Sequence, residues 1–179
     1  MRILVPLAEG FEEIEAVTTI DILRRAGIET ITAALKSNPV TGSHNIPVTA
    51  DMILNEKEKF DAIVLPGGIP GSINLKNDPR IIGLLKSINE AEGITAAICA
   101  APIVLSEAGL LKGKKFTCYP GHEKEITEGK YIEEPVVTDG KIVTSRGALC
   151  SPLFAFKIVE MVVGEKTAMQ LKEQMMSFW

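Results

Sequence analysis

Apolar residues recur along this chain in two spacings, one typical of buried strands and the other of amphipathic helices. Short continuous apolar runs predict strands covered on both faces, at residues 2–6, 29–35, 60–65, 94–98, 114–118 and 141–145, with a small hairpin or pair of edge strands over 40–51. Repeats of three and four predict helices over residues 12–26, 79–89, 103–109, 152–163 and 167–176. This alternation predicts an α/β fold with a doubly wound, mostly parallel sheet between helices.

The strand at 94–98 runs directly into a helix, and Cys99 occupies the corner between them. Such a turn resembles a nucleophile elbow, in which a strained backbone lifts the nucleophile above the sheet and aims N–H groups at the reacting atom. The start of the following helix adds partial positive charge, which favours thiolate over thiol. The local pattern leaves two interpretations open, a reactive Cys99 and a small buried hydrophobic residue.

Glu15 is a second unusual position, because it falls on the apolar side of its predicted helix. A projection at about 100° per residue places Glu15 between Ile22 and Ala26. A buried carboxylate is costly unless it is paired or protonated, so we expect Glu15 either to have a partner or to reach water from the edge of the arc. The opposite arc carries the charged side chains expected to be exposed, which are Glu13, Asp21, Arg24 and Arg25.

A glycine-rich turn follows the predicted strand at 60–65, with the sequence Pro66-Gly67-Gly68-Ile69-Pro70-Gly71. Ligands of open α/β sheets bind at the carboxyl ends of parallel strands. Glycines there allow a backbone N–H to approach a substrate closely. The Lys-Ser/Thr pair of a phosphate-binding P-loop is missing, so the turn is either part of another kind of site or simply tight.

Composition and charge narrow the class of protein. The 179 residues carry a net charge of −4 with no basic cluster, which argues against nucleic acid or an anionic membrane as the main partner. The three cysteines are an odd number without metal-site spacing, which suits a reducing cytoplasm. Nothing at the N-terminus directs export, and no uncharged run is long enough to span a bilayer. We therefore expect a single cytoplasmic domain over residues 1–179.

Four blocks of sequence resemble the ThiJ/PfpI superfamily, in the branch that contains the Parkinson-disease protein DJ-one. They occur in family order, at residues 8–17, at 65–68 with Gly71 and 74–75, at 97–102, and at 144–147. The resemblance implies a flavodoxin-like sandwich of the kind also found in class I glutamine amidotransferases. It further implies a protein that is commonly a homodimer and that uses neither a cofactor nor a metal.

The resemblance also implies roles for particular residues. Cys99 would be the reactive centre, facing a protonated Glu15 that is hydrogen-bonded to the thiolate. A carboxyl held in an apolar pocket has a raised pKa and can donate a proton to a developing alkoxide at neutral pH. The backbone N–H groups of Gly68 and Ala100 would supply the oxyanion site.

Three further side chains are auxiliary candidates. Tyr119 stands where many relatives place a histidine, so a Cys-His-Glu triad does not follow from the sequence. His122 is close in sequence but out of register, and a loop histidine is usually a surface residue. Cys118 ends the predicted strand at 114–118 and could lie near Cys99 as a resolving thiol or a soft-metal partner, with simple burial as the alternative.

Two functions compete for this set of residues. The first is a cofactor-free enzyme of the glyoxalase III or deglycase type, which acts on small 2-oxoaldehydes and early glycation adducts through Cys99 and Glu15. The second is a redox-sensing stress protein or chaperone in which Cys99 oxidises to a sulfinate. A cysteine peptidase is less well supported, because Ala100 stands where the peptidase branch places the histidine that activates its cysteine.

Overall fold

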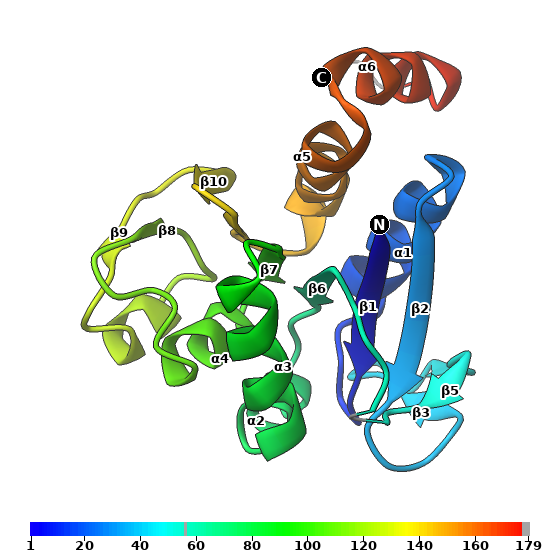
Figure 1. The fold of residues 1–179 in the computed structure, drawn as a ribbon. Helices are drawn as coiled ribbons and strands as arrows, with labels where there is room; N and C mark the ends of the chain where they lie inside the picture. Colours follow the sequence, from blue (N-terminus) through cyan, green and yellow to red (C-terminus); the bar gives the residue numbers. More distant parts are fainter. Residues whose placement is uncertain (56, 177–179) are drawn as a thin grey trace.

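A seven-stranded sheet forms the centre of the protein (Figure 1), in a computed structural model that describes residues 1–55 and 57–176. Its strands lie in the order β10-β11-β7-β6-β1-β2-β5 and are parallel except for β10, which is antiparallel to β11. The predicted mostly parallel sheet is thus confirmed. The strands are β1 (Arg2–Leu7), β2 (Glu29–Ala34), β5 (Met52–Ile53), β6 (Ala62–Leu65), β7 (Ile94–Ile98), β10 (Val136–Asp139) and β11 (Ile142–Ser145).

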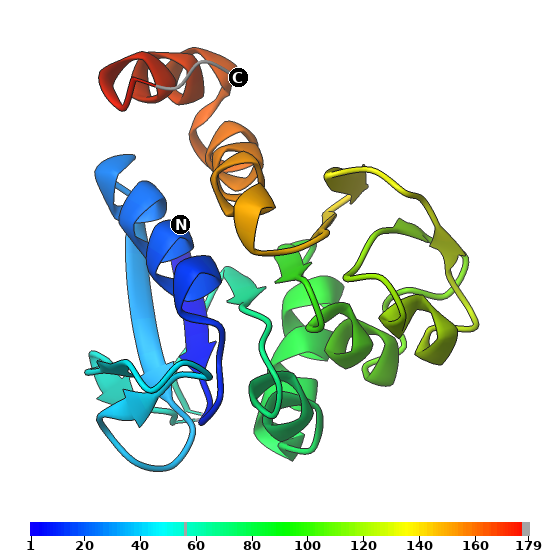
Figure 2. The same cartoon turned by 180° about the vertical axis from the view of Figure 1, so that it is seen from behind.

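Helices cover both faces of the sheet, as Figures 1 and 2 show from opposite sides. Because successive side chains of a strand point to opposite faces, Ile3 and Val5 of β1 join one hydrophobic cluster while Leu4 joins the other. The first face packs against α1 (Glu13–Arg25) and α5 (Ser151–Val163), and α6 (Glu165–Gln174) packs against α5. The second face packs against α2 (Gly71–Lys76), α3 (Pro79–Glu90) and α4 (Pro102–Glu107). The fold is the α/β flavodoxin-like sandwich expected from the sequence.

Three details of the chain differ from expectation or extend it. The hairpin expected within 40–51 is present as β3 (Val40–Thr41) and β4 (Pro47–Val48). The expected strand at 114–118 is shorter, and as β8 (Lys115–Phe116) it pairs with β9 (Lys130–Tyr131) in a sheet of its own. Helix α2 is missing from the sequence-based prediction, which assigns its first residue, Gly71, to the glycine-rich turn. Residues 56 and 177–179 of the expected domain lie outside the described residues.

Neighbouring strands of the sheet bring distant parts of the chain to the same edge. Strand β6 lies between β1 and β7, and the three run parallel. The turns after Leu7, Leu65 and Ile98 therefore all leave the sheet at its carboxyl edge. This edge holds the glycine-rich turn and Cys99, and α1 starts from it as well.

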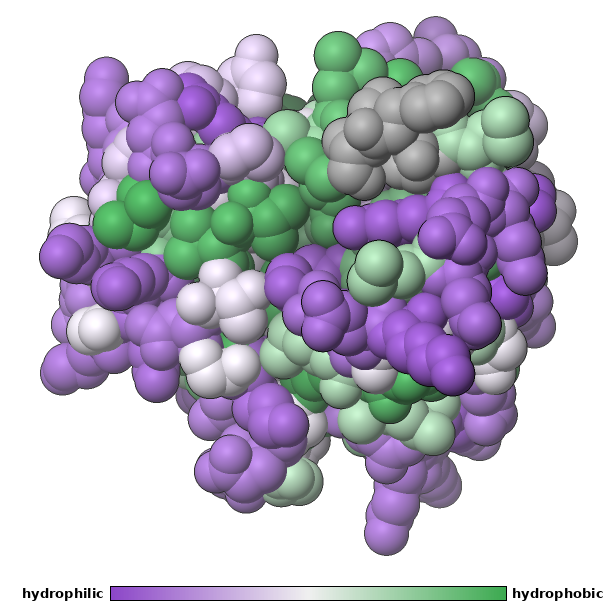
Figure 3. Space-filling model, turned by 90° about the horizontal axis from the view of Figure 1, so that it is seen from above, coloured by the Kyte–Doolittle hydropathy of each residue, from purple (hydrophilic) through white to green (hydrophobic). Residues whose placement is uncertain are grey.

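The outer layer at α5 and α6 retains some apolar surface. Figure 3 looks down on this end of the molecule and shows hydrophobic residues among hydrophilic ones on its surface. Val163 and Met169 are 39% and 54% exposed, and α6 buries Ala168 and Leu171. None of the helices within residues 1–55 and 57–176 is both long enough and apolar enough to cross a membrane.

Substitution of Phe154 tests the packing of α5 on the sheet. Phe154 is fully buried in the cluster shared with α1, so we expect Phe154→Ala to lower the free energy of unfolding by about 3–5 kcal/mol in urea denaturation. The exposed Met169→Ala is the control, with a change expected within about 0.5 kcal/mol. Equal losses in the two variants would contradict this account of the core.

Candidate active site

The corner after β7 has the backbone geometry that the sequence indicates. Cys99 has a φ of 63°, in the left-handed region that L residues other than glycine rarely adopt. Two backbone hydrogen bonds hold it there: Cys99 N–H donates to Ser145 O at 2.9 Å, and Tyr119 N–H donates to Cys99 O at 2.8 Å. The thiol is therefore fixed at the end of an interior strand, in a side chain that is half-buried.

Glu15 lies next to this corner and is completely buried. Helix α1 begins after Glu12, whose carboxylate accepts the Glu15 N–H at 2.7 Å and caps the first turn. The Glu15 Oε2 atom accepts the Gly67 N–H at 2.8 Å, and the carboxyl group interacts with the Cys99 thiol. Of the two alternatives for Glu15, the structure supports a carboxyl that is paired or protonated. The prediction that Glu15 reaches water from the edge of the arc is wrong, because the residue is 0% exposed.

Apolar side chains and a glycine enclose the pair. Glu15 lines a space too small for water together with Thr19 and mostly apolar residues, among them Val5, Ile98 and Phe154. A Cβ atom on Gly67 would lie 2.6 Å from Glu15 Oε2 and 2.7 Å from the Cys99 Cβ. Any larger residue at Gly67 would therefore force the carboxyl and the thiol apart.

The burial of two acidic groups side by side controls their protonation. Burial raises the pKa of Glu15 to about 7, against the lowering effect of the Cys99 thiol and the Gly67 N–H. Burial and the negative charge of Glu15 raise the pKa of the Cys99 thiol, against the lowering effect of the Ala100 and Gly68 N–H groups. Since two adjacent buried anions repel each other, the pair retains at least one proton near neutral pH.

This result corrects the expectation that the following helix lowers the thiol pKa. Helix α4 contributes only six residues, and burial together with the Glu15 charge outweighs it. Thiolate becomes accessible at this site when the proton moves to Glu15, because the carboxyl then loses its charge. The backbone N–H groups of Gly68 and Ala100 face the sulfur and favour that form.

The conformation of Gly68 explains why this position is glycine. Its φ is 92°, and a Cβ atom there would lie 2.5 Å from both Glu12 N and Gly10 O. Gly67 O accepts the Glu12 N–H at 2.9 Å, which ties the glycine-rich turn to the start of α1. The turn after β6 is therefore part of the site, and the close approach requires residues without side chains.

The auxiliary candidates Tyr119 and His122 lie on the same loop but make different contacts. Tyr119 is 53% exposed and is joined to Cys99 through its backbone N–H. His122 begins the short helix η1 (His122–Glu125), and its Nδ1 lies 3.0 Å from Glu125 Oε1. Its ring centroid is 6.4 Å from that of Tyr119. The imidazole is partly buried, at 24% exposed, and pairs with Glu125, so its place as a simple surface residue stays a prediction.

Cys118 packs on the other face of the sheet from Cys99. It is fully buried in the hydrophobic cluster that contains Phe116, whereas Cys99 packs against the cluster of the α1 face. Burial, followed by the charge of Glu123, raises the pKa of Cys118 to about 12. All three cysteines are free thiols, and this arrangement favours simple burial for Cys118.

Glu13 and His44 form a contact that the sequence does not reveal. Glu13 was expected on the exposed arc, but it is 6% exposed because residues 43–46 fold over it. Its carboxylate accepts the His44 N–H at 2.6 Å and lies 2.8 Å from His44 Nδ1. Burial alone would raise the Glu13 pKa, but the His44 ring and the backbone N–H groups of His44 and Ile46 lower it to about 2.

Among the described residues, one group of side chains could together hold a metal ion, and this contact is part of it. Donor atoms of Glu12, Glu13 and His44 lie within 4.8 Å of one another. The Glu13 carboxylate already accepts hydrogen bonds from the loop, so it holds residues 43–46 against α1. The partners are about thirty residues apart in the chain, and no periodic signal links them.

Known proteins are similar to this chain in both sequence and fold. The sequence profile of the DJ-1/PfpI family matches residues 1–161. Drosophila melanogaster DJ-1beta has a crystal structure that is 35% identical and superposes with a TM-score of 0.95, with 100% of each chain covered. The structure of oxidized Toxoplasma gondii DJ-1 is also 35% identical, with a TM-score of 0.95 and 99% of each chain covered.

Curated relatives have similar sequences but different lengths. Protein DJ-1 homolog B of Arabidopsis thaliana is 42% identical over 96% of this chain, and the chain spans only 40% of that protein's length. The glutathione-independent glyoxalase DJR-1.2 of Caenorhabditis elegans is 37% identical over 95% of this chain and 92% of its own length.

Glu15→Gln tests the protonation of the buried carboxyl through stability. The folded-state pKa of about 7 lies above the usual value, so this group favours folding below about pH 4.5 and loses that contribution as pH rises through 7. We therefore expect the melting temperature of the variant, minus that of the parent protein, to be roughly 6–12 °C higher at pH 8 than at pH 4.5. Calorimetry at both pH values measures this, with the exposed Glu90→Gln as control. A difference that does not change with pH would show that Glu15 is not a buried acid.

Proposed function

This chain belongs to the DJ-1/PfpI family, and from that premise we propose that it is a cysteine-dependent enzyme acting on 2-oxoaldehydes and early glycation adducts. One observation carries the proposal: a thiol at a left-handed corner, a buried carboxyl and two backbone N–H groups converge on one point. A relative named as a glutathione-independent glyoxalase supports it. The family also supports a stress-related role.

In the first step of the proposed reaction, the Cys99 thiolate adds to the aldehyde carbon of methylglyoxal. A carbon–sulfur bond forms, and the carbonyl oxygen takes up the electron pair. Glu15, protonated by the thiol, donates its proton to this oxygen and yields a hemithioacetal. The Gly68 and Ala100 N–H groups stabilise the negative charge while it develops.

In the second step, Glu15 is a carboxylate and acts as a base. It removes the proton from the former aldehyde carbon, and the neighbouring carbon receives a proton through an enediol. The aldehyde carbon is thereby oxidised and the ketone carbon reduced, so no external redox cofactor takes part. Water then hydrolyses the resulting thioester, which releases lactate and regenerates the Cys99 thiol.

Redox sensing is a second candidate function that one observation favours. The N–H groups of Gly68 and Ala100 that face the Cys99 sulfur could also hold the oxygens of a sulfinate. Two molecules of peroxide would supply those oxygens and leave as water. A solved relative described as oxidized makes this chemistry worth measuring in parallel.

A homodimer in the cytoplasm belongs to the same proposal. Ile14 and Val17 of α1 are 50% and 48% exposed, and Leu149 in the short helix η2 (Ala148–Cys150), which contacts α1, is 90% exposed. Large apolar side chains exposed on one surface are typical of protein interfaces. We expect sedimentation at micromolar concentration to give the mass of a dimer and Val17→Glu to give a monomer. A monomeric parent protein would contradict this part.

Lactate formation from methylglyoxal, without glutathione or added metal, tests the enzyme. We expect Cys99→Ala to abolish turnover and Glu15→Gln to reduce it by roughly a hundredfold or more, because the proton transfers are lost. Cys150→Ala is the matched cysteine control and should retain turnover.

Three outcomes separate the two functions. Loss of turnover in both site variants supports the enzyme and its two roles. Unchanged turnover in Cys99→Ala would refute the mechanism. No turnover in the parent protein, with Cys99 gaining two oxygens in peroxide by mass spectrometry, would favour the redox sensor.

A further inference from the structure

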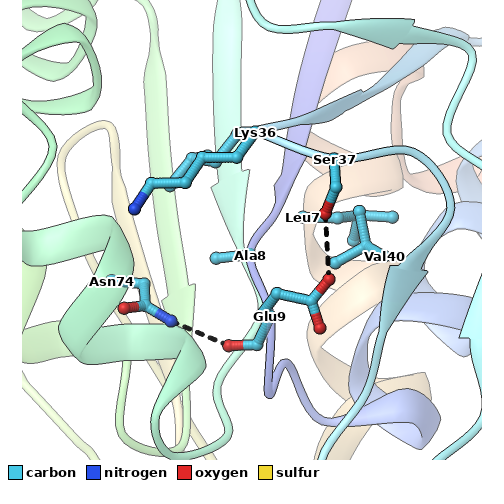
Figure 4. Close-up of a pocket in the computed structure, with 8 residues that line it drawn as sticks. Leu7, Ala8, Glu9, Lys36, Ser37, Val40 and Asn74 are labelled. Atoms are coloured by element: carbon cyan, nitrogen blue, oxygen red, sulfur yellow. Dashed lines mark hydrogen bonds between the residues drawn. The ribbon is translucent and has the colours of Figure 1, made fainter.

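A second cavity opens at the carboxyl ends of β1 and β2, on the other side of β1 from β6 and β7 (Figure 4). Its volume is about 70 Å³, which is room for several water-sized groups. None of the residues placed around Cys99 lines it. The lining residues are Leu7, Ala8, Glu9, Leu35, Lys36, Ser37, Val40 and Asn74.

The floor of this cavity is apolar. Leu7, Ala8, Leu35 and Val40 are between 0% and 5% exposed, and their contacts with the sheet fix them. Leu35 N–H, for example, donates to Leu7 O at 3.0 Å. A floor of this size has room for an aliphatic group of a few carbon atoms.

One side of the mouth carries a carboxylate in a fixed orientation. Glu9 Oε1 accepts the Ser37 hydroxyl at 3.2 Å, and Glu9 Oε2 accepts the Thr41 N–H at 3.2 Å. The Asn74 side chain donates to Glu9 O at 2.9 Å, which fixes the backbone as well. Each carboxylate oxygen retains a lone pair for a cationic ligand group.

The other side of the mouth carries an ammonium group. In Figure 4, Lys36 extends over the cavity, and its amine lies on the opposite side from the Glu9 carboxylate. Among the described residues, no hydrogen bond or ion pair engages the Lys36 amine. The mouth therefore presents one positive and one negative group above an apolar floor.

We propose that this cavity binds a free zwitterionic amino acid with a short aliphatic side chain, such as valine. The side chain would occupy the floor, the carboxylate would pair with Lys36, and the ammonium would pair with Glu9. Charge complementarity selects this class of ligand, since Glu9 repels a simple anion and Lys36 repels a simple cation. The site is separate from the proposed reaction at Cys99 and does not depend on it.

Three matched probes test the proposal: L-valine, isovalerate, which lacks the ammonium, and isobutylamine, which lacks the carboxylate. Binding is followed by titration with ¹H–¹⁵N NMR, using the backbone signals of Leu7, Ala8 and Val40. We expect L-valine to bind at least about fivefold more tightly than either fragment, because each fragment lacks one of the two ion pairs. The Cys99→Ala variant should bind valine as the parent protein does.

Two conservative variants at exposed positions reverse the preference. Lys36→Gln should bind isobutylamine at least as well as valine, and Glu9→Gln should bind isovalerate at least as well. Lys86→Gln on α3 is the control and should keep the order of the parent protein. Absence of shifts at these signals with valine, or an unchanged ligand order in both variants, would overturn the proposal.

Discussion

The burial of the Glu15 carboxyl beside the Cys99 thiol is the constraint on which the rest of the site depends. Two acidic groups buried side by side are not both ionised near neutral pH, so the pair retains at least one proton. That proton is available to an aldehyde oxygen when the thiol reacts. Because Gly67 has no side chain, the Glu15 carboxyl and the Cys99 thiol have room to lie side by side. The chemistry therefore depends on packing as much as on the identity of the two reactive residues.

The parallel sheet supplies the geometry that this pair requires. Strands β6 and β7 end side by side, so the glycine-rich turn and the Cys99 corner meet without a long loop. Helix α1 starts beside them because Gly67 O accepts the Glu12 N–H. The left-handed backbone of Cys99 is strained, and the hydrogen bonds to Ser145 and Tyr119 hold it in place. These hydrogen bonds thus offset the conformational cost of the left-handed backbone at Cys99.

The segment after β2 connects two regions of the same sheet edge. Val40 and the Thr41 N–H contribute to the cavity at Glu9, while His44 a few residues later covers Glu13 on α1. Glu13 is separated from Glu15 by one residue of the same helix. Residues 41 and 44 are thereby hydrogen-bonded to both regions, and Glu15 lies in the same first turn of α1 as Glu13.

The parallel sheet, the strand-to-helix corner at Cys99 and the unusual position of Glu15 could be predicted from the sequence, because they follow from local periodicity and chain order. The burial of Glu13, the pairing of β8 with β9 outside the main sheet and the raised Cys99 pKa became visible only in the folded chain. Burial and charge at these positions come from segments distant in sequence, such as His44 for Glu13, and no local pattern encodes those contacts.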